Sequence, residues 1–78
     1  MAPAQEQELD QLRDQYKQAV DAWIEAIRAE EALANVDGSM VVYEHWDKAH
    51  FSEEDARNAA KAARDSYKDA LRQIHFGI

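Results

Sequence analysis

The side chains of this sequence best suited to chemistry lie close together in the middle of the chain. Glu44, His45, Asp47 and His50 place carboxylate and imidazole groups within one short segment. Asp47 and His50 are three residues apart, so on a helix they point to the same side. Helical bundles build di-metal sites from a carboxylate three residues before a histidine, with further glutamates on a facing helix. Oxygen and imidazole ligands of this kind suit iron, manganese or zinc.

Glutamates for such a site are available earlier in the chain. If the chain turns back near Asp37-Gly38, Glu30 lies opposite His45 and Glu25 lies opposite His50. Two features argue against a site: an aspartate reaches less far than a glutamate, and helical phase places Asp47 on the outer side. The alternative interpretation is a polar patch in which the histidines cover a tryptophan. We predict no bound cofactor, and keep these metal-ligand candidates: His45, Asp47, His50, Glu25 and Glu30.

Other catalytic groups are scarce. The sequence has no cysteine, which excludes thiol nucleophiles, disulfides and thiolate metal sites. Its serines are Ser39, Ser52 and Ser66, of which the first two are better explained as helix caps. No glycine-rich phosphate loop occurs. We therefore expect a protein that is not an enzyme.

Composition excludes further classes of function. The 78 residues carry a net charge of −7, whereas nucleic-acid and anionic-membrane binding need a dense basic face. No stretch approaches the roughly 20 apolar residues of a membrane span. The polar, acidic start does not resemble a signal peptide. We expect one domain over residues 1–78 of a cytoplasmic protein that binds neither nucleic acid nor membrane.

The first half of the chain predicts one long helix. Only two glycines and one proline, Pro3, interrupt the sequence, and helix-forming residues are abundant. We expect residues 1–4 to be disordered and a helix over about 5–35. Its apolar residues recur in steps of three and four, which places them on one stripe. The members of this stripe that we assign to the core or interface are Leu9, Leu12, Tyr16, Trp23 and Ile27.

The second half predicts another long helix, over about 39–75, that follows a turn at Asp37-Gly38 and ends at Gly77. A heptad frame gives its core or interface residues as Val42, Trp46, Ala56, Ala60, Ala63, Tyr67 and Ile74. Glu53 alone breaks the apolar series. Ser52 followed by acidic residues resembles a helix start, so the alternatives near 50–52 are a kink or a separate helix.

Together these elements predict an all-α fold, an antiparallel two-helix hairpin in which bulky residues of the first helix oppose an alanine-rich face of the second. The aromatic residues exceed what one seam between two helices can cover. We therefore expect a homodimeric four-helix bundle whose function is protein–protein interaction, with itself or with another protein.

One family shares this general architecture. A small helical hairpin with a tryptophan near its turn resembles the secreted WXG-type proteins, and here the corresponding residues are Trp46-Asp47-Lys48. Lysine replaces the glycine of the motif, and Trp46 lies several residues past the expected turn. The resemblance is therefore one of architecture, and it implies no residue role and no secretion.

Overall fold

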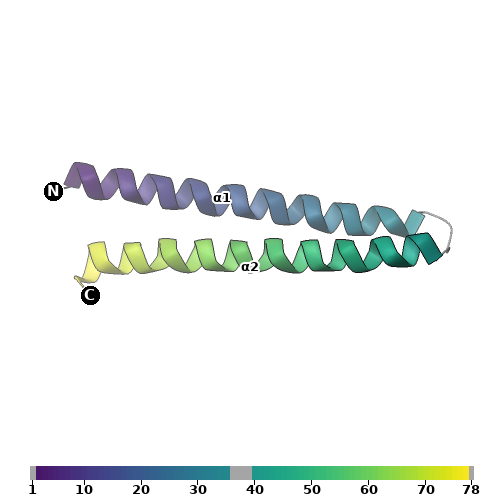
Figure 1. Cartoon of the computed structure of the whole chain (residues 1–78). Coiled ribbons are helices and arrows are strands. Elements are labelled where there is room, and N and C mark those ends of the chain that lie inside the picture. The colour runs from purple at the N-terminus through teal and green to yellow at the C-terminus, as the bar shows by residue number, and fades with distance from the viewer. Residues whose placement is uncertain (1, 36–39, 78) are drawn as a thin grey trace.

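The computed structural model describes residues 2–35 and 40–77, with side-chain environments for residues 6–34 and 43–77. Helix α1 spans Ala2–Ala32 and ends in a short 3-10 turn, η1, over Leu33–Asn35. Helix α2 spans Met40–Phe76. The two helices run antiparallel and side by side along their whole length (Figure 1). The predicted all-α helical hairpin is confirmed.

The start of α1 differs from the prediction. The helix begins at Ala2, so residues 2–4, which we expected to be disordered, are helical. Pro3 fits this position because a proline in the first helical turn lacks an N–H group that would have no partner there anyway. The other end tightens into η1, a common way for a helix to finish. The predicted turn at Asp37-Gly38 and the expected cap Ser39 lie outside the described residues.

Helix α2 is continuous through residues 50–52. The alternative of a separate helix beginning at Ser52 is therefore wrong, and Ser52 is an exposed residue within the helix. At its far end, Gly77 adopts a positive φ of 71° and its N–H donates to the Gln73 carbonyl oxygen at 2.9 Å. A glycine in this conformation closes a helix without strain on a side chain, as the sequence predicts.

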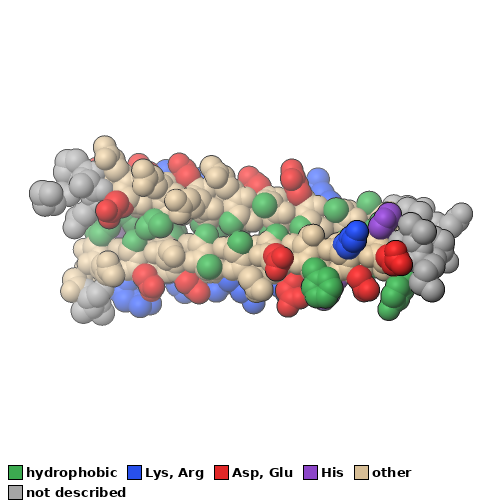
Figure 2. Space-filling model, viewed as in Figure 1, with side chains coloured by type: hydrophobic (Ala, Val, Ile, Leu, Met, Phe, Trp, Pro, Cys, Tyr) green, Lys and Arg blue, Asp and Glu red, His purple; other side chains and the backbone are tan. Residues whose placement is uncertain are grey.

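The contact between the helices, which we call the seam, contains few buried side chains. Ala60 is 3% exposed, and it is the one buried residue among those whose side chains are described. The molecule measures 58 × 18 × 12 Å, so it is a rod in which most side chains reach solvent. Figure 2 shows apolar side chains along the seam and charged side chains along the outer edges of both helices.

Within the described residues, neither helix contains an apolar stretch long enough to cross a bilayer.

Candidate interaction face and carboxylate–imidazole cluster

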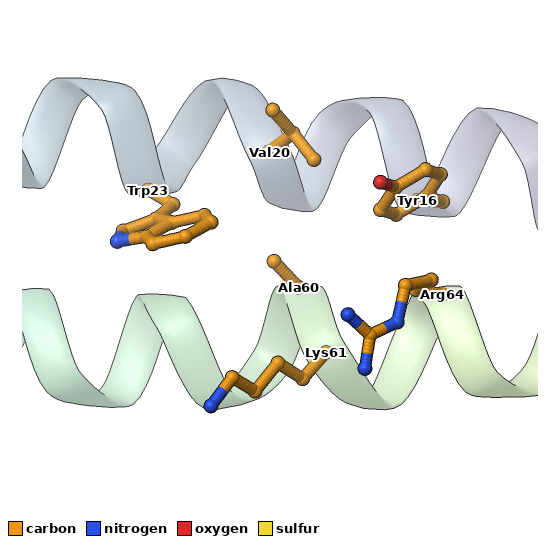
Figure 3. Close-up of a pocket in the computed structure, with 6 residues that line it drawn as sticks. All are labelled: Tyr16, Val20, Trp23, Ala60, Lys61 and Arg64. Carbon is orange, nitrogen blue, oxygen red and sulfur yellow. The ribbon is translucent and has the colours of Figure 1, made fainter.

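A shallow pocket lies at the middle of the seam, around Ala60. It is lined by Tyr16, Val20 and Trp23 of α1 and by Ala60, Lys61 and Arg64 of α2 (Figure 3). The small side chain at Ala60 leaves room for the two aromatic rings of α1, as packing of large residues against small ones requires. Val20, Lys61 and Arg64 line the pocket on one side of the seam, and this side is called the pocket face below.

Two stripes of residues extend the pocket face along the helices. On α1, Val20 continues to Ile24 and Ile27 in steps of four and three. On α2, Trp46 precedes Arg64 by 18 residues, which are five helical turns, so both point in the same direction. The pocket face therefore carries apolar residues of both helices, and the polar His50 lies on the same side of α2, 14 residues before Arg64.

Large apolar side chains are exposed on this face and elsewhere. Ile24 and Ile27 are each 42% exposed and Trp46 is 36% exposed. Phe51 is 64% exposed but precedes Ala60 by nine residues, or two and a half turns, so it points away from the seam. The apolar residues of the pocket face thus come from both helices, whereas Phe51 on the outer side of α2 belongs to one helix only.

The predicted core and interface residues divide into three groups. Ala60 is buried, while half-buried positions are Leu9, Leu12, Tyr16, Trp23, Ala56, Ala63, Tyr67 and Ile74. Ile27 and Trp46 are exposed in the isolated hairpin. The side chain of Val42 lies outside the described residues.

A carboxylate occupies the seam next to Trp23. The indole Nε1 of Trp23 donates a hydrogen bond of 2.8 Å to Oε2 of Glu53. The guanidinium Nε of Arg57 lies 3.7 Å from the same oxygen, and the Glu53 side chain is 14% exposed. A polar group at such a position costs free energy unless it is hydrogen-bonded, and here it has a donor from the facing helix.

The same carboxylate belongs to a cluster of three metal-ligand side chains. Glu30 of α1 and His50 and Glu53 of α2 each offer an oxygen or ring nitrogen, and these atoms all lie within 4.8 Å of one another. Glu30 and Glu53 are half-buried, and His50 is exposed. His50 Nε2 also lies 3.8 Å from Oε2 of Glu54, one turn further along α2.

The structure brings together two of the five metal-ligand candidates that the sequence suggests. Glu30 and His50 belong to the cluster, whereas His45, Asp47 and Glu25 are exposed and lie outside it. The third member, Glu53, is not among the candidates from the sequence, where it stands out only as an interruption of the apolar series. Its spacing of three residues from His50 is the signal that identifies it, since residues three apart share one side of a helix.

Comparison with known proteins gives no relative: no protein-family model, no curated protein and no solved structure matches this chain.

Proposed function

We propose that this protein is a non-enzymatic interaction module that associates with itself, two hairpins packing their pocket faces together as a four-helix bundle. The observation that carries the proposal is the exposure of Ile24, Ile27 and Trp46 on one face of the hairpin, beside a seam that buries little. Covering such a face with a second copy gives these residues the core that the isolated hairpin lacks.

Surface area supports the proposal quantitatively. The chain exposes 6101 Å². A compact globular monomer of this mass, 8.9 kDa, exposes about 4,800 Å². The excess of about 1,300 Å² exceeds the roughly 800 Å² that each partner buries in a standard interface.

Charge favours a second copy as the occupant of this face. On the pocket face α2 carries Arg57, Lys61 and Arg64, while residues 6–32 of α1 carry eight acidic and three basic side chains over all sides of the helix. A two-fold axis along the hairpins lays α1 of each copy over α2 of the other. This arrangement lays α1, which is acidic overall, beside the basic stripe of α2 twice, and a long-range attraction of this kind favours association.

Sedimentation velocity on paired variants tests the proposal. The double substitution Ile24→Glu and Ile27→Glu places charges on the pocket face, and we expect it to weaken dimerisation at least about a hundredfold, because central apolar residues supply most of an interface's binding energy. The matched control, Phe51→Glu, places a charge at a more exposed apolar residue that points away from the seam. It should leave the dissociation constant within about twofold of the parent value.

Two outcomes would overturn the proposal. One is a well-folded parent protein that sediments as a monomer at micromolar concentration. The other is a dimer that survives the double substitution but is lost with Phe51→Glu, which would place the interface on the outer side of α2. Circular dichroism on each variant verifies that the helices are intact.

The proposal also places the module in the cytoplasm. Its cysteine-free hairpin requires no disulfide, the bond that oxidising compartments supply. Fractionation of the native host tests this location.

A further inference from the structure

We propose that Glu30, His50 and Glu53 form a binding site for one divalent transition-metal ion that joins α1 to α2. The three ligand atoms converge within 4.8 Å from two helices that are separate in sequence. His50 and Glu53 lie one turn apart on α2, while Glu30 reaches across the seam from α1. All three ligands belong to one chain, so the donor set is complete in a single hairpin.

The donor set selects the class of metal. One imidazole nitrogen and two carboxylate oxygens suit zinc, iron or manganese, whereas calcium and magnesium prefer oxygen ligands alone. Three protein ligands leave a position for water, the arrangement of an open zinc site. The exposure of His50 gives the ion and its water a path to solvent.

Only a small adjustment is needed for coordination. A tetrahedral zinc ion with bonds of about 2.1 Å holds its ligand atoms about 3.4 Å apart. The cluster, whose ligand atoms lie within 4.8 Å of one another, must therefore contract where a separation exceeds this value. The side chain of His50 is 57% exposed, so it can turn from its contact with Glu54 towards the two carboxylates without disturbing the packed seam.

Trp23 holds one ligand in place. Its indole N–H donates to Oε2 of Glu53, and hydrogen bonds of this kind orient a ligating carboxylate and support metal binding. A carboxylate has about four lone-pair positions over two oxygens, so it can accept this bond and still bind a cation. Two further charged groups lie nearby: the carboxylate of Glu54 beside His50 and the guanidinium of Arg57 beside Glu53. Their charges are opposite, so their effects on a bound cation oppose each other.

Isothermal titration with Zn²⁺ tests the site in the full chain, with Mg²⁺ and Ca²⁺ titrated separately. We expect one Zn²⁺ per chain with micromolar affinity, and no saturable binding of the other two ions up to about 1 mM. His50→Ala and Glu30→Gln should each weaken Zn²⁺ binding at least about tenfold, because each removes one of three ligands. Zn²⁺ should raise the melting temperature of the parent protein and not that of His50→Ala.

Matched controls separate this site from adventitious binding at the surface. His45→Ala and Glu25→Gln remove the same chemical groups at exposed positions outside the cluster, and each should leave Zn²⁺ affinity within about twofold. Equal losses from His45→Ala and His50→Ala would overturn the proposal, as would no Zn²⁺ binding at about 1 mM. Sedimentation of the same samples reports self-association separately, so failure here leaves the dimer proposal untouched.

Discussion

The pairing of Trp23 with Glu53 is the most specific polar contact across the seam. The 2.8 Å hydrogen bond joins residues that are 30 positions apart, so it forms only in one alignment of the two helices. A shift of α2 by one heptad would place the carboxylate against other residues and leave it without the indole donor. At this position the protein accepts a polar side chain in the seam and thereby specifies the alignment of its helices.

Removal of the indole donor gives the first prediction at this scale. Trp23→Phe keeps an aromatic ring but deprives Glu53 of its hydrogen bond, so we expect the free energy of unfolding to fall by about 1–3 kcal/mol. Glu53→Leu added to Trp23→Phe should restore much of this loss, because removing both polar partners is less costly than removing one. Urea denaturation in the absence of metal measures Trp23→Phe, Glu53→Leu and the double variant. A double variant that loses the sum of the two single effects would show that the pair is not coupled.

The sequence could not show that Glu53 pairs with Trp23. In the heptad frame it interrupts an apolar series, and nothing in one sequence reports that an indole N–H faces it from the other helix. The cluster with Glu30 escaped prediction for a related reason. An alignment estimated from the turn pairs Glu30 with His45, whereas the helices bring it to His50, about one turn further along.

At the scale of the helices, Ser52 shows how a local signal is overridden. Serine followed by acidic residues is typical of a helix start, yet α2 is unbroken from Met40 to Phe76. The apolar stripe on either side of Ser52 keeps the same phase, so both parts of α2 pack on α1 without a break. Packing along a long partner helix outweighs a capping preference of about 1 kcal/mol.

The substitution Ser52→Ala should change the free energy of unfolding in opposite directions depending on whether α2 is continuous at Ser52 or begins there. In a continuous helix, Ser52→Ala should increase the free energy of unfolding by about 0.5 kcal/mol, because alanine is the better helix former. A serine that began a helix would instead cost about 1 kcal/mol on the same change. Ser66→Ala, at another exposed position within α2, is the matched control and should give a similar small gain. Destabilisation by Ser52→Ala alone would contradict a continuous α2.

Most of the element structure could be predicted, since it follows from spacing. Proline only at Pro3, glycine only at Gly38 and Gly77, and apolar steps of three and four define two long helices. The helix ends were less predictable. The helical state of residues 2–4 depends on how α1 begins around Pro3, and short polar segments carry no apolar pattern.

At the scale of the molecule, the hairpin is extended. Its radius of gyration is 17.5 Å, whereas a compact domain of this length has about 11.5 Å. An elongated pair of helices has two broad faces, and only the seam between them is covered. Exposed Ile24 and Ile27 are a consequence of this shape, and their proposed cover is a second copy.

Coupling of folding to self-association predicts a stability that depends on protein concentration. A tenfold rise in concentration should raise the melting temperature by about 3–5 °C, because the dimer is favoured by mass action. The Ile24→Glu and Ile27→Glu variant should melt at the same temperature at all concentrations. Differential scanning calorimetry over a hundredfold range of concentration provides the comparison. A parent melting temperature that does not change would show that the hairpin folds as a monomer.

The antiparallel hairpin also determines how the molecule responds to mechanical force. The start of α1 and the end of α2 lie at the same end of the rod, opposite the end of α1 and the start of α2 (Figure 1). A load applied between Ala2 and Gly77 therefore opens the contacts between the helices one after another, beginning at the termini. A load applied between the two ends of α1 instead runs along that helix, so the contacts between the helices are not pulled open one after another. We therefore expect the hairpin to open at lower force when its two ends are pulled apart than when one helix is pulled along its length.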